Sequence, residues 1–205
     1  MKEPAMPTSA SNLPARGWAL IAALIAALLM WACPAQADEA TWALLKQGGQ
    51  VVLVRHALTD PGVGDPPGFA LDDCKTQRNL SATGRAEAQR LGAAFRGRAV
   101  PVARVLSSPW CRCIETAKLA FNSVTPWAAL GSPRGATEGT NRESLQALRA
   151  ALVQARARPG RFEAWVSHMF VLSDLVQSST ASGEGLVLQA DAAGAVVVLG
   201  RLLAP

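Results

Sequence analysis

Three short apolar segments that end abruptly in polar residues constrain the fold of this chain more than any other feature. Each is long enough for one strand, and the first is a continuous, mostly β-branched run typical of a strand buried on both faces. The segments are 51–54 before Arg55 and His56, 102–106 before Ser107 and Ser108, and 162–166 before Ser167 and His168.

Segments with helical periodicity separate these strands. A capping box, Thr140-Asn141-Arg142-Glu143, opens a helix that runs to about Ala157. The other expected helices are 41–47, from Ser81 or Thr83 to about Arg96, from Pro109 through Leu119, and from His168 to about Gln177. Residues 60–78, rich in Pro and Gly, and 122–139 are predicted to be long loops, and long loops are often functional. Residues 186–188 and 195–199 predict a closing hairpin that turns at 191–194.

This alternation predicts an α/β fold, a three-layer α/β/α sandwich whose central sheet is mostly parallel and ends in a C-terminal hairpin. In such folds ligands bind at the carboxyl ends of the strands. The three polar pairs are all at predicted carboxyl ends, so we expect them to converge on one site.

The first 37 residues have the layout of a secretory signal. Lys2 and Arg16 precede an apolar run from Trp18 to Ala32, and small residues follow it, so cleavage is expected after Ala37. The domains are therefore 1–37, a signal peptide, and 38–205, the folded domain, with a periplasmic or secreted location. The run is shorter than the roughly 20 residues that span a bilayer. An uncleaved anchor and lipidation at Cys33 are the alternatives.

Three cysteines remain after that cleavage: Cys74, Cys111 and Cys113. In an oxidising compartment an odd number suggests one disulfide and one free thiol. Cys74 is the expected partner of one of the other two, and sequence alone leaves the choice open. A zinc site is the competing interpretation, but a Cys-x-Cys pair with one remote Cys lacks zinc-ligand spacing.

Composition excludes several classes of protein. Half of the 205 residues are hydrophobic and 17% are charged, which excludes an intrinsically disordered chain. The net charge of +5 suits an anionic ligand, yet no block of Lys and Arg indicates a nucleic-acid partner. Tyrosine is absent and aromatic residues are scarce, which argues against a base-stacking surface.

The chain has only two histidines, and each follows a predicted strand. A single histidine is most often a satisfied, half-buried side chain. Two at strand ends, one of them beside Arg55, indicate chemistry instead. Neutral imidazole is a nucleophile near neutral pH, and guanidinium groups match the oxygens of a phosphoryl group. Phosphoryl transfer uses both.

The motifs around these residues resemble the histidine phosphatase superfamily, which has the phosphoglycerate-mutase-like fold. Residues 52–57, Val-Leu-Val-Arg-His-Ala, are similar to its first signature, with Ala57 where the family usually has Gly. Segments 77–89 and 106–117 resemble the stretch after the first loop and the second arginine motif. Residues 165–168, Trp-Val-Ser-His, resemble the second histidine motif. These motifs occur along the chain in the same order as in the family.

The resemblance implies a role for each matching residue. His56 is the expected nucleophile, which forms a phosphohistidine that water hydrolyses. Arg55, Arg112 and His168 are expected to stabilise charge on the transferring phosphoryl group. Arg112 lies near a predicted helix start, where the dipole disfavours a cation, so we also expect an anion to bind there. Contacts at the rim of the site are expected from Thr59, Arg78 and Asn79.

The proton donor for the leaving group is less constrained. Family spacing puts a carboxylic acid in the loop after the second arginine motif, which makes Glu138 the first candidate. Glu184 is the second, and a site without a dedicated acid is the third. Glu143 is expected to serve the helix cap. Ser107 and Ser108 are expected to be turn and cap residues, and Met169 and Phe170 to form an apolar wall.

The predicted function is a metal-independent phosphatase that hydrolyses phosphomonoesters, with no cofactor and a small phosphorylated substrate. After signal cleavage we expect no stable membrane span. The alternatives are a phosphomutase and an inactive pseudoenzyme of the cell envelope that binds a phosphorylated ligand. Retention of a phosphohistidine would separate an enzyme from a binding protein.

Overall fold

The computed structural model describes residues 35–203, except for Val63 and residues 133–139. Residues 38–205 form one compact unit. The apolar run of the predicted signal peptide and the candidate acid Glu138 therefore lie outside the described residues.

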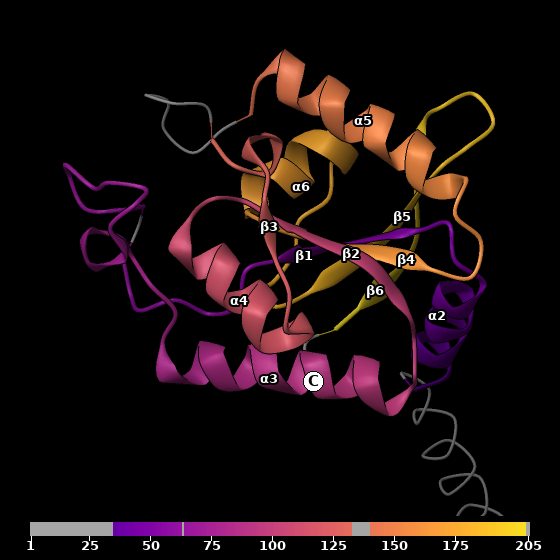
Figure 1. Cartoon of the computed structure of the whole chain (residues 1–205), viewed down its shortest axis with the longest axis horizontal. Helices are drawn as coiled ribbons and strands as arrows, with labels where there is room; N and C mark the ends of the chain where they lie inside the picture. Colours follow the sequence, from indigo (N-terminus) through magenta and orange to yellow (C-terminus); the bar gives the residue numbers. More distant parts are fainter. Residues whose placement is uncertain (1–34, 63, 133–139, 204–205) are drawn as a thin grey trace, which may run out of the picture. The chain divides into compact units, whose positions relative to one another are not determined.

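A six-stranded sheet forms the centre of the domain, in the order β3-β2-β4-β1-β5-β6 (Figure 1). The pairs β3–β2, β2–β4 and β4–β1 are parallel, whereas β1–β5 and β5–β6 are antiparallel. This is the predicted mostly parallel sheet with a C-terminal hairpin. The strands are β1 (Val51–Arg55), β2 (Val102–Ser107), β3 (Thr125–Pro126), β4 (Phe162–Ser167), β5 (Gly185–Ala190) and β6 (Val196–Leu202).

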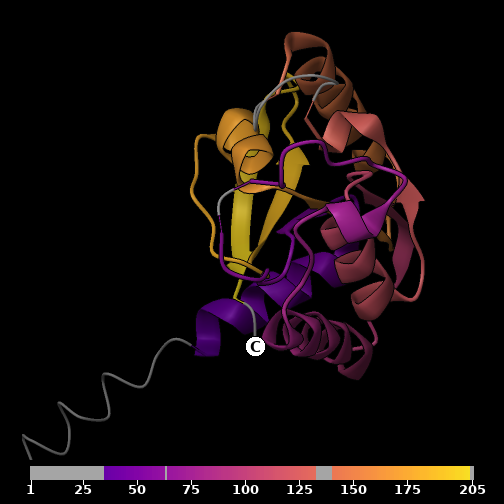
Figure 2. The ribbon, with the colours of Figure 1, turned by 90° about the vertical axis from the view of Figure 1, so that its left-hand side faces the viewer.

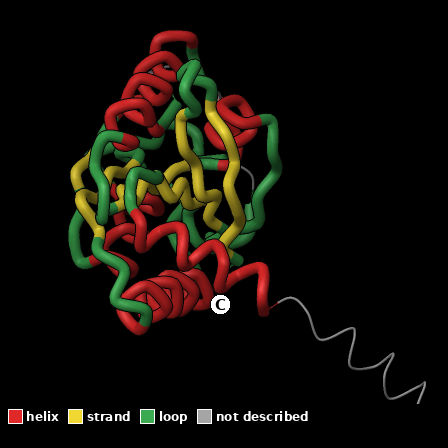
Figure 3. The backbone as a smooth tube through the Cα atoms, turned by 90° about the vertical axis from the view of Figure 1, so that its right-hand side faces the viewer, coloured by secondary structure: helices red, strands yellow, loops and turns green. Residues whose placement is uncertain are grey.

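Helices cover both faces of the sheet, which confirms the three-layer prediction. In Figure 1, α2, α3 and α4 lie below the sheet, and α5 and α6 lie above it; Figures 2 and 3 show the same layers from either side. The helices are α2 (Ala35–Gln47), α3 (Ala82–Gly97), α4 (Cys111–Phe121), α5 (Arg142–Arg156) and α6 (Met169–Val176), with short 3-10 turns η1 (Cys74–Thr76) and η2 (Ala128–Leu130).

Two apolar clusters lie on opposite faces of the sheet because side chains alternate along a strand. In β1, Val52 and Val54 belong to the cluster between the sheet and helices α2, α3 and α4. Val51 and Leu53 belong to the cluster between the sheet and helices α5 and α6. Every residue of β4 is buried. Burial on both faces thus fixes the positions of the carboxyl ends of β1 and β4.

Two local expectations were wrong. Asn141, not Thr140, caps α5: its Oδ1 accepts a hydrogen bond from the Ser144 amide at 2.8 Å. The Thr140 hydroxyl instead donates to Asp174, a tertiary contact that the local sequence does not reveal. The predicted loop 122–139 also contains β3 and η2, because β3 finds a pairing partner in β2.

One disulfide joins Cys74, in the loop between β1 and α3, to Cys111 at the start of α4, and Cys113 is a buried free thiol. This confirms the expected single bridge and selects one of the two open pairings. Within the described part of the chain, no helix is long and apolar enough to cross a membrane.

Candidate active site

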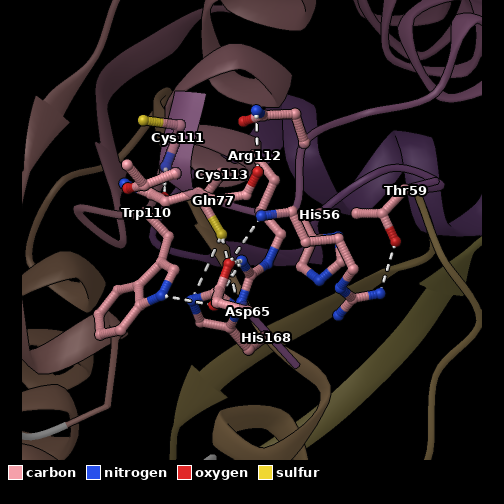
Figure 4. Close-up of polar contacts among 12 residues, drawn as sticks. His56, Thr59, Asp65, Gln77, Trp110, Cys111, Arg112, Cys113 and His168 are labelled. Carbon is pink, nitrogen blue, oxygen red and sulfur yellow. Dashed lines mark hydrogen bonds and ion pairs between the residues drawn. The ribbon is translucent and has the colours of Figure 1, made fainter. Parts of the chain in front are cut away.

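The polar residues after β1, β2 and β4 meet at one edge of the sheet, as predicted. β4 lies between β1 and β2, and the registers align Arg55 with Ser167 and Ser107 with Val166. The His56 amide donates to the Ser167 carbonyl at 2.9 Å. Neighbouring parallel strands therefore place both histidines at one end of the sheet (Figure 4).

His56 is nearly buried, and one of its ring nitrogens is engaged. Its Nδ1 lies 2.9 Å from the carbonyl oxygen of Ala57. A carbonyl can only accept, so Nδ1 carries the proton and Nε2 keeps its lone pair. Nucleophilic attack by imidazole needs such a nitrogen.

The surroundings keep His56 uncharged. Burial lowers its pKa to about 3, and the positive charges of Arg112, Arg55 and Arg78 act in the same direction. The hydrogen bond to the Ala57 carbonyl opposes them but does not prevail. The imidazole is therefore neutral across the ordinary pH range.

His168 stands across from His56, with the ring centroids 5.4 Å apart. Burial, followed by the charge of Arg112, lowers its pKa well below the usual value. Its Nε2 lies 2.7 Å from the hydroxyl of Ser108. Its ring stacks on Phe170 at 5.0 Å and meets the edge of Trp110 at 5.4 Å. Packing and one hydrogen bond thus hold this second imidazole.

Arg112 lies in the first turn of α4, where the helix dipole disfavours a cation. Arg112 is 1% exposed, and a buried guanidinium requires a counter-charge. Asp65 supplies one: Nη1 of Arg112 donates to both carboxylate oxygens, at 2.8 and 3.0 Å. The anion expected at this position is therefore, in this structure, a side chain of the same protein.

Sequence reasoning missed Asp65 altogether. Its Oδ2 also accepts from Trp110 Nε1 at 3.0 Å, and its Oδ1 accepts from the Arg78 amide at 3.0 Å. The only local signal was an acidic residue inside a long loop rich in Gly and Pro. Ser108 was also missed as a partner of His168, because it was expected to serve only a turn or cap.

Arg55 leaves the sheet beside His56. Its Nη1 donates to the Thr180 carbonyl at 2.6 Å, and its backbone pairs with Gly183 and Glu184. The loop before β5 therefore holds both the backbone of Arg55 and one end of its guanidinium group. Its charge contributes to the lowered pKa of both histidines.

Of the three residues predicted at the rim, Thr59 and Arg78 contact each other, whereas Asn79 contacts the backbone of its own loop. Thr59 accepts a hydrogen bond from Arg78 Nη1 at 2.7 Å, so these two are in contact, and Arg78 contributes to the lowered pKa of His56. The Asn79 amide group donates to the carbonyls of Cys74 and Gln77 and so holds the loop together.

Glu184 is occupied by structural contacts. Its Oε1 lies 2.5 Å from Arg201 Nη1, and its Oε2 accepts from the Ala181 amide at 2.8 Å. Both oxygens of this carboxylate are therefore committed to contacts within the protein.

Thr116 links the two halves of the site. Its hydroxyl accepts from the Ala57 amide at 3.1 Å and donates to the Arg112 carbonyl at 2.7 Å. Ala57 is not among the described residues with positive φ, so its methyl group is compatible with the backbone where relatives usually have Gly. Gly84 allows α3 to approach this turn, since a Cβ there would lie 1.9 Å from the Leu58 carbonyl oxygen.

Cys113 lies against His168, with Sγ 3.6 Å from Nε2. Burial raises the pKa of this thiol to about 12, so it is protonated and unreactive as a nucleophile. Within the described ranges, no group of three His, Cys, Asp or Glu side chains could hold a metal ion. The described residues therefore bring a neutral imidazole together with arginine cations.

A family model decides the relationship. The model of the histidine phosphatase superfamily (branch 1) matches residues 51–171, which include both histidines and Arg112. The chain belongs to the histidine phosphatase superfamily. A search of curated proteins by sequence found no match.

Solved structures share this superfamily fold. The protein histidine phosphatase SixA, complexed with tungstate, aligns with a TM-score of 0.56 at 18% identity, over 75% of this chain and 96% of that one. A phosphoserine phosphatase mutant from Entamoeba histolytica, in complex with phosphoserine, gives 0.54 at 13%, over 74% and 95%. The α-ribazole phosphatase from Shigella flexneri gives 0.53 at 18%, over 76% and 96%. At these identities the likeness establishes the fold.

Proposed function

We propose that this protein is a metal-independent phosphatase that hydrolyses phosphomonoesters through a phosphohistidine on His56. The observation that carries the proposal is the state of His56, a neutral imidazole whose Nδ1 is committed to the Ala57 carbonyl and whose Nε2 is left for attack. The family match and the phosphatases among the structural neighbours support it.

The reaction has two steps in this proposal. Nε2 of His56 forms a bond to phosphorus while the bond from phosphorus to the ester oxygen breaks, and the alcohol leaves with a proton. Water then attacks the phosphohistidine, which releases phosphate and restores the imidazole. Arg55 and Arg112 stabilise the charge on the equatorial oxygens throughout, since phosphoryl transfer depends chiefly on positioning and electrostatics.

His168 is assigned to the same phosphoryl group. It is neutral, and the Ser108 hydroxyl can accept from its Nε2 or donate to it. A neutral imidazole supplies a hydrogen bond without adding a third positive charge. Glu138 remains the candidate proton donor, because the other candidate, Glu184, is bound to Arg201.

The first test is hydrolysis of an aryl phosphate by residues 38–205 between pH 4 and 8. His56→Ala should lose activity by a factor on the order of 10⁴ or more, because the nucleophile is gone. Glu143→Ala changes an exposed position on α5; it is the matched control and should keep the wild-type activity. Activity that survives in His56→Ala would end the proposal. EDTA should have no effect, and loss of activity in EDTA would contradict the metal-free mechanism.

A second candidate function is a phospho-ligand-binding protein without turnover. The engagement of Glu184 by Arg201 favours it, since that pairing removes one possible acid from the chemistry. Acid-labile phosphate retained on His56 after mixing with an aryl phosphate would exclude it.

We also propose that the protein is exported and works in the periplasm or outside the cell. The N-terminal signal pattern and the Cys74–Cys111 bridge support this location. Mass spectrometry of the protein from an expressing bacterium should find Asp38 as its first residue; an intact N-terminus or a lipid on Cys33 would contradict the expected cleavage.

A further inference from the structure

Asp65 lies in a surface loop, yet its side chain is buried. The loop residues after it, from Pro66 to Phe69, are exposed, yet its carboxylate is only 6% accessible. Burying a charge is costly unless strong partners surround it. Apolar packing therefore does not explain the inward position of this carboxylate; its polar partners must.

The partners of this carboxylate are those that an oxyanion needs. Arg112 Nη1 donates to both oxygens, Trp110 Nε1 donates to one, and the Arg78 amide donates to the other (Figure 4). The same donors, two nitrogen–hydrogen groups around a guanidinium, would suit a phosphoryl group equally well.

The carboxylate does not satisfy Arg112 fully. Only Nη1 contacts Asp65, and the buried Nε of Arg112 has no hydrogen-bond acceptor among the described residues. A tetrahedral phosphoryl group offers more oxygens and more charge than a carboxylate does. It is therefore the better ligand for this arginine.

We propose that Asp65 is an internal ligand of the phosphoryl subsite, and that a phosphomonoester binds by displacing its carboxylate from Arg112. This inference rests on the proposed function, which assigns Arg112 to the phosphoryl group. Displacement weakens the binding of every anion by the same factor, so only a ligand that interacts strongly with Arg112 occupies the site. A singly charged ligand only replaces one negative charge with another, whereas a phosphomonoester dianion adds a second charge beside the buried guanidinium.

The surrounding loop allows this exchange. Gly62 and Gly64, just before Asp65, both have positive φ, a conformation that glycine enters and leaves at little cost. Asp65 and Arg78 are among the residues that line an open hollow of about 420 Å³. The far end of the loop stays attached to α4 through the Cys74–Cys111 disulfide. Only the segment near Asp65 has to move.

Two probes of the same shape and different charge test the proposal. Phenylphosphonate is a non-hydrolysable dianion at pH 8, and benzenesulfonate is a monoanion. Calorimetry on the purified protein should find that the wild type binds the phosphonate and strongly disfavours the sulfonate. Asp65→Asn keeps the shape of the side chain and removes the charge. It removes the competing carboxylate for any anion, so it should bind both ligands more tightly by about the same factor, about tenfold, with the preference for the phosphonate unchanged.

Asp72→Asn is the matched control, because it removes one negative charge from an exposed position in the same loop. It should leave both affinities unchanged. Weaker phosphonate binding by Asp65→Asn would mean that Asp65 positions Arg112, and equal binding would mean that it does not compete; either overturns the inference while hydrolysis by the wild type still supports the proposed function. Absence of phosphonate binding in all variants, together with no hydrolysis, would overturn both.

Loss of the buried counter-charge could also unfold Asp65→Asn. Thermal melting with and without phenylphosphonate covers that case. A competing carboxylate predicts that the ligand raises the melting temperature of Asp65→Asn more than that of the wild type. An equal or smaller rise would contradict the proposal.

Discussion

The strand ends and the loop between β1 and α3 build the same site by different means. At the strand ends, the parallel pairing of β1 and β4 places His56 and His168 through backbone hydrogen bonds. The loop, residues 58–81, contributes Asp65 and is joined to Arg112 and α4 by side-chain hydrogen bonds and a disulfide. Backbone pairing thus holds the two histidines at the strand ends, whereas the loop supplies its counter-charge through a side-chain contact.

Among the changes that test this comparison, removal of Arg112, the residue that joins the two regions, should have the largest effect. Arg112→Ala should lower the rate of aryl phosphate hydrolysis by about 10²–10³-fold, as expected for the loss of a preorganised charge. It should also destabilise the domain by roughly 3–5 kcal/mol, since the Asp65 carboxylate loses its buried partner.

Chemical denaturation of Arg112→Ala and of the double variant Arg112→Ala/Asp65→Asn would check this coupling. The double variant should recover part of the lost stability and none of the activity. Additive losses would show that the two side chains act independently, and the contrast between the two regions would then disappear.

The disulfide is the second way to separate the regions. Replacing Cys74 and Cys111 together by Ser should lower the free energy of unfolding by roughly 2–5 kcal/mol, because the bridge closes a long stretch of chain. The neutral state of both histidines should persist, since it depends mainly on burial. Nuclear magnetic resonance titration of the imidazoles would measure this, and a histidine that titrates near pH 6.5 would show that the loop maintains their burial.

The strand-end region makes its own prediction for pH. The pKa of His56 is about 3 in the folded protein and 6.5 in the unfolded chain, so below pH 6.5 the unfolded chain binds a proton that the native protein does not. Stability should therefore fall as the pH drops from 6.5 towards 3, by about 1.4 kcal/mol per pH unit for each such histidine.

Denaturation curves of the wild type and His56→Asn between pH 7 and 4 would test this slope. The variant should have a shallower dependence on pH. Identical slopes would mean that His56 is solvated in the folded protein, contrary to its burial.

The smallest effect concerns the cap of α5, far from either region. Asn141→Ala should cost about 1 kcal/mol, because the Ser144 amide loses its acceptor. Thr140→Ala removes only a surface contact to Asp174 and should cost less. The reverse order in thermal denaturation would restore Thr140 as the cap.

The sequence by itself determined the framework of the site. The apolar run before Arg55 and His56 is typical of a doubly buried strand, and the strand–helix alternation implied a mostly parallel sheet. Parallel neighbours bring their carboxyl ends together, so the meeting of both histidines followed from local patterns. The two possible partners of Cys74 were also apparent, although not the choice between them.

Only the tertiary structure decided what those residues contact. Asp65 precedes Arg112 by 47 positions in an irregular loop, and no periodicity relates two such residues. The same holds for Ser108 beside His168 and for Glu184 bound to Arg201. Local sequence specifies secondary structure through patterns of a few residues, whereas loop contacts depend on where the complete chain brings distant segments together, and on the cost of leaving a buried charge unpaired.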